Sequence, residues 1–489
     1  METILDSFIA SAEEAEASCA VNPFNGVEDV PRNEKEWSRV FARWLNGKVC
    51  FVPEENSWRC WDGKHWVRDS DAQKINRLCK QFVDELILYA QTSTDIADNT
   101  RQGFVSFVNR YNKFNDRRTL INDTKCELTV KRECFDAKTN LINLQNGVFD
   151  LETFTFTGGH NPDDMLSRIA NVTYDPNATC YEWERFLDQS LMGDSETIEF
   201  LQVVLGLALT CDVSIECMFI LLGKTRSGKS TTVDTIQHML NQDDDGYSCS
   251  CNPESFAVKR YNDASKPSSD IARLANRRFV VTSEPQKNML LDIGKIKLLT
   301  GGEPITARFL KENDFQFYPQ FTLVMTANNA PKVNDMTLFE SDRVHVIPFN
   351  NHLEADQRDL GLKKRLKSSG SLSGIFNWCI AGLQRFREKG LVPSSQSIMA
   401  TENYKAESDK ISNFMRDCLI ASREGCITGK AVFDAYKQWC KDSGYEAGGK
   451  QAFFHELRER NLMVDSCTVG SLTKRNVVPG FMLAEGYSF

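Results

Sequence analysis

The stretch Gly223-Lys224-Thr225-Arg226-Ser227-Gly228-Lys229-Ser230-Thr231 decides the fold of the middle of this chain. It is a complete G-x-x-x-x-G-K-[ST] phosphate-binding loop. The apolar run 218–222 precedes it and predicts a buried parallel strand, and residues 231–240 follow it with a helical pattern. Because the motif needs a strand before it and a helix after it, this context favours a nucleotide-binding loop over a chance match in a flexible loop.

The residue types in this loop suit a triphosphate. Gly223 and Gly228 allow backbone N–H groups to turn towards phosphate oxygens. Lys229 supplies a positive charge at the β- and γ-phosphates, and the hydroxyl of Ser230 suits Mg²⁺. The sequence therefore predicts an ATP-binding loop that acts with Mg²⁺ and comprises Gly223, Lys224, Thr225, Arg226, Ser227, Gly228, Lys229, Ser230 and Thr231.

Composition narrows the class of protein. A length of 489 residues suggests about three domains, and 41% apolar with 26% charged residues is ordinary for a globular protein. There is no apolar run of about 18 residues and the acidic N-terminus lacks a basic region, so we expect neither a membrane span nor a signal peptide. The 16 cysteines are scattered without a C-x₂-C zinc pattern, which favours free thiols in a reducing cytoplasm.

Three further strands are predicted after the loop, at residues 278–284, 321–329 and 343–349. Strands that alternate with helices indicate an α/β fold with a parallel sheet, and ligands gather at the carboxyl ends of such strands. Glu284 and Asn328 stand at two of these ends. Glu284 suits orienting the attacking water or holding a water on Mg²⁺, and Asn328 suits a hydrogen bond to that water or to the γ-phosphate. A solvated glutamate and an Asn-Asn-Ala-Pro turn are the plainer alternatives.

Arg343 begins the last of these strands. A guanidinium that reaches the γ-phosphate of a neighbouring subunit would act as an arginine finger. A solvated or ion-paired arginine is the alternative, and the sequence alone leaves both open.

Residues 301–317 predict a β-hairpin with a polar tip at residues 311–314. Arg308 and Lys311 are the candidate contacts to DNA phosphates, and a hairpin that simply faces solvent is an equal alternative.

The flanking regions predict further elements. Residues 58–66 predict two strands around an Asp-Gly turn, and residues 140–151 predict two strands around an Asn-Gly turn. The nearby aromatic residues suit either base stacking or, more commonly, a small core. Residues 241–250 are polar and predict a loop, residues 354–390 predict helices, and residues 391–397 predict a linker. From residue 405 onwards, three helices and a terminal hairpin suit a winged-helix domain.

Together these pieces resemble the superfamily 3 DNA helicases, of the satellite-phage and poxvirus primase-helicase type. The order and spacing of the pieces agree with that family. The matching pieces are the phosphate loop, residues 278–284, residues 297–308, Thr326-Ala327-Asn328-Asn329-Ala330-Pro331 and residues 343–349, with residues 61–66 and 146–151 upstream and residues 408–483 downstream.

The resemblance implies an AAA+-like P-loop sheet with helices on both faces and a ring, usually a hexamer, that translocates on single-stranded DNA. It also implies that Lys229 and Ser230 bind ATP and Mg²⁺, Glu284 activates water with Ser230 near the metal, and Asn328 senses the γ-phosphate. Arg343 would act in trans, and Lys311 would grip DNA beside Arg308. Family members often carry paired arginines where this chain has Asp342 before Arg343. No primase signature precedes Trp37, so a separate primase or polymerase is the expected partner.

We therefore expect an ATP-dependent DNA helicase that acts on single-stranded and forked DNA in the replication of a phage, plasmid or mobile element. A bacterial cytoplasm is the expected setting. The expected organisation is an acidic leader (1–35), an α+β region (36–180), the ATPase domain (181–350, with its core at 216–350), a helical extension (351–400) and a winged-helix domain (405–489). The alternatives are a replication initiator without processive unwinding and a non-replicative ATPase such as a defence or packaging motor.

Overall fold

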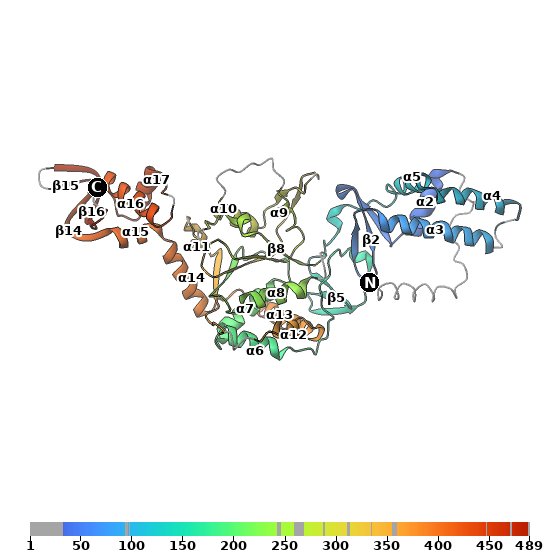
Figure 1. Cartoon of the computed structure of the whole chain (residues 1–489), viewed down its shortest axis with the longest axis horizontal. Helices are drawn as coiled ribbons and strands as arrows, with labels where there is room; N and C mark the ends of the chain where they lie inside the picture. The colour runs from blue at the N-terminus through green and yellow to red at the C-terminus, as the bar shows by residue number, and fades with distance from the viewer. Residues whose placement is uncertain are drawn as a thin grey trace. The chain divides into compact units, whose positions relative to one another are not determined.

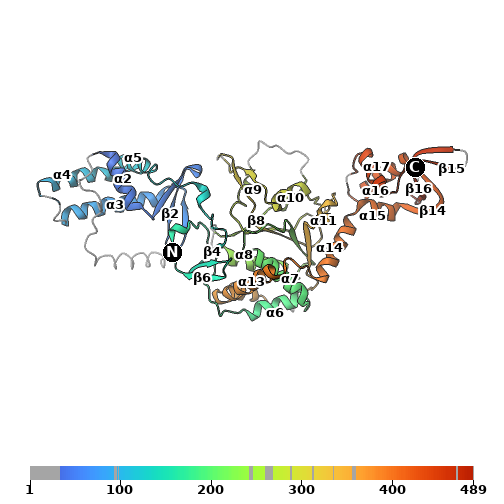
Figure 2. The same cartoon turned by 180° about the vertical axis from the view of Figure 1, so that it is seen from behind.

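The computed structural model describes residues 33–92, 96, 98–241, 246–258, 268–286, 289–310, 313–333, 335–354, 359–445, 447–469 and 472–487 (Figures 1 and 2). The chain divides into two units. The first comprises residues 1–174, 240–247 and 311–313, and the second comprises residues 175–239, 248–310 and 314–489.

The first unit contains a small antiparallel sheet packed on helices. Strands β1 (Val49–Val52), β2 (Ser57–Trp61) and β3 (Trp66–Asp69) pair in that order. Their hydrophobic partners come from α2 (Glu34–Leu45), α3 (Gln73–Thr92), α4 (Asp98–Asn109) and α5 (Phe114–Thr124). Trp37, Phe41 and Trp58 are buried in this cluster. Most of the aromatic residues in this region therefore fill a core, as the commoner alternative predicted.

A second antiparallel sheet completes the first unit. It consists of β4 (Leu141–Leu144), β5 (Gly147–Asp150) and β6 (Thr155–Gly158). Gly147 follows the tight turn, and a Cβ atom there would lie 2.2 Å from the carbonyl oxygen of Thr157. The close approach of β6 therefore requires glycine at this position.

A five-stranded parallel sheet organises the second unit, with the strand order β13-β7-β12-β9-β8. Its members are β7 (Met218–Leu222), β8 (Ser248–Cys251), β9 (Phe279–Ser283), β12 (Thr322–Ala327) and β13 (Val344–Pro348). The central strands are almost wholly buried, as their continuous apolar runs require when both faces of a sheet are covered. Figures 1 and 2 show α7, α8 and α13 on one face and α9 and α10 on the other.

The helices of this unit have the following bounds: α6 (Tyr181–Ser190), α7 (Ser195–Leu207), α8 (Lys229–Leu240), α9 (Ser269–Ala272), α10 (Ile293–Thr300), α11 (Thr337–Glu340), α12 (Leu362–Leu366), α13 (Ser369–Lys389) and α14 (Ser395–Ser408). Helices α7 and α13 cross closely because both contribute glycine. A Cβ atom on Gly206 would lie 2.4 Å from the backbone nitrogen of Leu383, and one on Gly382 would lie 2.0 Å from the carbonyl oxygen of Gln202. A short hairpin, β10 (Ile305–Ala307) with β11 (Phe315–Phe317), is also present.

The C-terminal part follows the order helix, strand, two helices, two strands. Its elements are α15 (Lys410–Cys418), β14 (Leu419–Thr428), α16 (Gly429–Asp442), α17 (Lys450–Glu459), β15 (Val464–Val469) and β16 (Leu472–Leu483). The strands pair in the order β14-β16-β15. Phe414, Trp439 and Phe453 lie in its own hydrophobic cluster, so this part has a separate core.

Most predicted strands and helices are confirmed, including the two N-terminal hairpins, the strands of the parallel sheet and the β10–β11 hairpin. In the second N-terminal hairpin the two turn residues are Gln145 and Asn146, rather than the predicted Asn146 and Gly147. Three expectations were wrong. The stretch 241–250 was expected to be a loop, but Ser248–Cys251 forms the edge strand β8. The linker expected at residues 391–397 ends at Ser394, where the hydroxyl caps the first turn of α14. From residue 405 onwards only helices and a terminal hairpin were expected, but a further strand, β14, begins at Leu419 and pairs with β16.

Candidate functional site

The loop after β7 is fixed by contacts that exclude side chains at its two glycines. A Cβ atom on Gly223 would lie 2.1 Å from the carbonyl oxygen of Phe349, and one on Gly228 would lie 2.4 Å from the hydroxyl of Ser190. Gly228 also has a φ of +103°, which favours glycine. The loop therefore keeps its backbone close to its neighbours and ends where α8 begins, at Lys229.

Lys229 is the centre of the site and is only 6% exposed. Its ammonium donates to the carbonyl oxygens of Gly223 (2.5 Å) and Lys224 (2.8 Å) and to the hydroxyl of Ser227 (3.1 Å). It also lies 3.3 Å from the side-chain oxygen of Asn328. Burial lowers the pKa of Lys229, and the nearby charge of Glu284 opposes that shift. A buried cation with exchangeable oxygen partners is suited to receive phosphate oxygens.

Glu284 and Asn328 follow two neighbouring strands, β9 and β12. Both side chains are exposed at the carboxyl edge of the sheet. The backbone of Glu284 has a φ of +52°, and its N–H donates to Thr326 at 2.9 Å. A non-glycine residue in this region is strained by about 1–3 kcal/mol, and such strain is common at functional sites. The structure thus gathers Lys229, Asn328 and Glu284 at one edge, with the exposed Ser230 in the first turn of α8.

Several contacts around the loop were missed from the sequence. The segment after β13 returns to the loop, where a ring nitrogen of His352 lies 2.8 Å from the carbonyl oxygen of Thr225. The N–H of Leu353 donates to the carbonyl oxygen of Arg226 at 3.2 Å. Arg226 has a φ of +66°, so these contacts support a strained turn. The only sequence signal for these contacts is that the segment directly follows a predicted strand.

Arg343 lies at the opposite edge of the sheet. Its carbonyl oxygen accepts from the N–H of Met218, the first residue of β7, whereas the phosphate loop follows the last residue of that strand. A five-residue strand separates the two edges by about 13 Å. The guanidinium of Arg343 forms a 2.5 Å ion pair with Glu216 and lies 3.3 Å from the hydroxyl of Thr300. Within one chain, Arg343 is therefore not brought to Lys229.

The two predicted DNA contacts stand in the sequence between β10 and β11. Arg308 is partly exposed and lies 3.6 Å from a carboxylate oxygen of Asp314. Lys311 falls outside the residues that the structure describes.

The oxygen ligands near the loop fit a Mg²⁺ ion that is held mainly by phosphate and water. In the described part of the chain, no group of three or more His, Cys, Asp or Glu side chains is placed to hold a metal. Ser230 and Glu284 are the two predicted metal-site residues, and both are exposed at the site. This sparse set suits Mg²⁺, which commonly keeps several waters and takes its other ligands from substrate phosphates.

Two further observations concern the chain as a whole. Among the described helices, none is long and apolar enough to cross a bilayer. The cysteines that the structure describes are free, with Cys79 and Cys379 fully buried.

Comparison with known proteins finds matches at two places in the chain. Residues 38–191 match the model described as "D5 N terminal like", and residues 406–483 match "Poxvirus D5 protein-like". The chain thus carries two domains of the D5 type, which is a type of primase-helicase. The two matches flank the parallel sheet, so the phosphate loop lies between them in the sequence.

Relatives of this chain include "Putative helicase L207/L206" of Acanthamoeba polyphaga mimivirus, with 25% identity over 81% of this chain and 44% of the relative. "Putative helicase 121R" of Invertebrate iridescent virus 3 is 24% identical over 64% of this chain and 37% of the relative. The chain thus spans less than half the length of either. A solved structure of the NrS-1 C-terminal region aligns with a TM-score of 0.49 and 11% identity, over 92% of this chain and 100% of that chain. The predicted bacterial host remains a prediction.

Proposed function

We propose that this protein is an ATP-dependent DNA helicase that works as a homo-oligomeric ring in the replication of a mobile genetic element or virus. The observation that carries the proposal is the convergence of Lys229, Asn328 and Glu284 at the carboxyl edge of a five-stranded parallel sheet. The two matches to D5-type models support the helicase role. The sheet, with helices on both faces, fits the AAA+-like fold that the sequence resemblance implies.

Binding of ATP would exchange the oxygen partners of Lys229. Its ammonium now shares three N–H donors among four protein oxygens, so phosphate oxygens can replace some of them without leaving a buried cation unpaired. The glycines at positions 223 and 228 let the loop backbone pack against Phe349 and Ser190, and N–H groups of this backbone can donate to the phosphates. Mg²⁺, when bound beside Ser230, would neutralise charge on the β- and γ-phosphates.

Hydrolysis requires a placed water and a stabilised γ-phosphate. Glu284 is exposed at the end of β9, where its carboxylate can orient a water and accept its proton. The side chain of Asn328 stands on the next strand and can hydrogen-bond the γ-phosphate or the attacking water. Glu284 would thus position the attacking water, and Asn328 would stabilise charge on the γ-phosphate. Catalysis of phosphoryl transfer depends mainly on these two effects.

Arg343 would complete the site from a second copy. It lies at the amino edge of the sheet, far from the loop of its own chain, so it can serve only a neighbour's γ-phosphate. This geometry supports a ring in which each ATP site lies between two subunits.

DNA would bind through the β10–β11 hairpin and, separately, through the C-terminal part. Arg308 and Lys311 are the proposed hairpin contacts. The element order and strand order of residues 410–483 fit a winged-helix domain, a fold that suits duplex DNA or a partner protein. A separate primase or polymerase is the proposed protein partner.

The test is strand displacement on a forked duplex by the purified chain. The proposal expects Mg²⁺- and ATP-dependent displacement that is lost in Lys229→Ala. ATP hydrolysis stimulated by single-stranded DNA, without any displacement, would favour an origin-binding initiator instead. An ATPase that remains monomeric and ignores single-stranded DNA would contradict both roles.

A further inference from the structure

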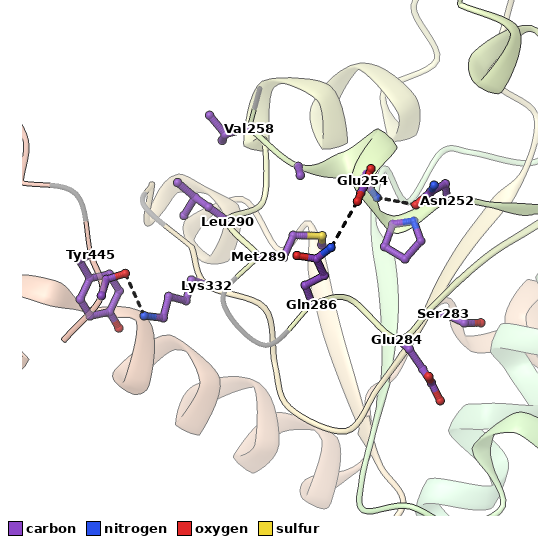
Figure 3. Close-up of a pocket in the computed structure, with 13 residues that line it drawn as sticks. Asn252, Glu254, Val258, Ser283, Glu284, Gln286, Met289, Leu290, Lys332 and Tyr445 are labelled. Carbon is purple, nitrogen blue, oxygen red and sulfur yellow. Dashed lines mark hydrogen bonds between the residues drawn. The ribbon is translucent and has the colours of Figure 1, made fainter. Parts of the chain in front are cut away.

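A charged contact joins the loop after β12 to the C-terminal part of the same unit. The ammonium of Lys332 donates to the carbonyl oxygens of Ser443 (3.0 Å) and Gly444 (3.2 Å). It also lies 4.1 Å from the centre of the Tyr445 ring, which is a cation–π distance. Figure 3 shows Lys332 extended towards Tyr445 at one side of the pocket.

The loop that carries Lys332 is the one that carries Asn328. Three residues lie between them, and the loop is held at several points. Asn328 contacts Lys229, the carbonyl oxygen of Pro331 accepts from Tyr404 at 2.7 Å, and the backbone of Lys332 bonds with Met289 and Leu291 at 2.9 Å each. A short segment fixed in this way transmits a displacement at one end to the other, because its bonded backbone cannot absorb it.

On the other side, Lys332 meets the end of helix α16. Ser443 is the C-terminal cap of that helix, where carbonyl oxygens lack helical partners and the helix dipole favours a cation. Tyr445 stacks on the buried Trp439 at 5.5 Å with an interplanar angle of 17°. The contact therefore leads directly into the core of the C-terminal part.

A cavity beside this contact allows its geometry to change. A pocket of about 670 Å³ lies beside it and is lined by Glu284 and Gln286 as well as by Lys332 and Tyr445. The catalytic edge and the end of α16 thus face one cavity rather than a closely packed interface. A single charged contact beside a cavity can open and close without disrupting a core.

We propose that Lys332 is a positioning residue that couples the occupancy of the ATP site to the placement of the C-terminal domain. The inference rests on the proposed function, because the ligand that acts on Asn328 is the γ-phosphate of ATP. A γ-phosphate competes for Lys229 and Asn328, so their mutual contact changes on binding, and the loop carries that change to Lys332. By linkage, the contact in turn changes the affinity for nucleotide by the same factor.

The test is hydrogen exchange at the backbone of Ser443, Gly444 and Tyr445 in the full chain, with and without Mg²⁺ and a non-hydrolysable ATP analogue. All three N–H groups donate to carbonyls of α16, so their exchange reports the stability of the helix end. We expect the analogue to change their exchange by about fivefold or more in the natural chain. Lys332→Met, which keeps the stem but removes the donors, should abolish this response and shift the affinity for the analogue by a similar factor.

Lys410→Met is the matched control, because the Lys410 ammonium lies 5.2 Å from the same Tyr445 ring but belongs to α15 of the C-terminal part. It should retain the response to nucleotide. Binding of the analogue is measured on the same samples by calorimetry. The coupling would be overturned if the analogue binds but the hydrogen exchange at residues 443–445 does not change. It would also be overturned if the exchange changes equally in Lys332→Met. Both outcomes would leave the ATP site intact. Failure of the natural chain to bind the analogue would instead overturn the proposed function, and the coupling with it.

Discussion

Arg343 and Glu216 form an ion pair of 2.5 Å at the amino edge of the parallel sheet, opposite the phosphate loop. The Glu216 side chain is half exposed and that of Arg343 is 18% exposed, so the pair is accessible at the surface. Exposed ion pairs contribute about 0–1 kcal/mol to stability. Such a pair can be exchanged for a phosphate without unfolding the chain, so a structural role of Arg343 can be distinguished by experiment from its proposed role in trans.

Arg343→Ala should abolish ATP hydrolysis in the assembled protein, by about 10³-fold or more, while changing the free energy of unfolding by about 1 kcal/mol or less. The reason is that its proposed target is a neighbour's γ-phosphate. Mixing Arg343→Ala with Lys229→Ala subunits should restore part of the activity, because some interfaces then contain both natural residues. Steady-state hydrolysis by the mixture measures this.

Glu216→Gln separates the two roles of Arg343. It removes the charge partner but leaves the guanidinium, so we expect hydrolysis at or above the natural rate. If Glu216→Gln instead loses as much activity as Arg343→Ala, the intrachain ion pair is what matters and the role in trans is wrong.

Lys229→Met should reduce ATP hydrolysis by more than about 100-fold, because it removes the charge that meets the β- and γ-phosphates. The matched control is Lys364→Met, whose exposed side chain lies on α12, outside the phosphate loop. Its rate should stay within a few fold of natural. Circular dichroism of both variants checks that the loss is not unfolding, and equal losses in the two variants would contradict a specific role for Lys229.

Asn328→Ala should lower kcat by about 10²–10³-fold with little change in KM, as expected when one hydrogen bond to developing charge is lost. Asn329→Ala is the control, since the neighbouring side chain is also exposed at the edge of the sheet. A rise in KM at constant kcat would show that Asn328 binds the ground state and the transition state equally, which would contradict a specific role in the transition state.

The sequence predicted which residues meet at the carboxyl edge of the sheet because its signals are local. The phosphate loop, the strand ending at Glu284 and the strand ending at Asn328 are each contained in a few consecutive residues. A parallel sheet then brings their carboxyl ends to one edge, whichever order the strands take. The contact between Lys229 and Asn328 follows from that geometry.

The parts that were missed lack a local signal. Ser248–Cys251 forms a strand although serine and cysteine alternate there, since pairing with β9 compensates for a weak strand pattern. The ion pair of Arg343 with Glu216 and the contact of His352 with Thr225 each join residues 127 positions apart. Only the folded topology brings such residues together.

Gly382→Ala should destabilise the second unit by about 1–3 kcal/mol, because the added methyl group would meet the backbone of α7 where neither helix can move freely. Gly370→Ala, in the same helix, is the matched control. A Cβ atom there has nothing within 4 Å, so alanine should be neutral or slightly stabilising. Urea unfolding of both variants measures the difference, and equal midpoints would contradict the close crossing of α7 and α13.

The stability of the parallel sheet should fall as the pH drops below about 6.5, with His345 as one identifiable cause. This residue of β13 stacks on Phe219 at 5.8 Å, and burial lowers the pKa of its imidazole, while Asp342 opposes the shift. The folded chain therefore holds His345 neutral, whereas the unfolded chain binds a proton near pH 6.5. The contribution of neutral His345 to the free energy of unfolding is therefore complete above that pH. As the pH falls further, it decreases by up to about 1.4 kcal/mol per pH unit.

Because carboxylates also titrate on acidification, the comparison is between the natural chain and His345→Phe, each unfolded thermally at pH 7.5 and pH 5.5. The natural chain should lose more stability than the variant over this interval, and an equal loss in both would show that His345 is protonated as easily in the fold as in the unfolded chain.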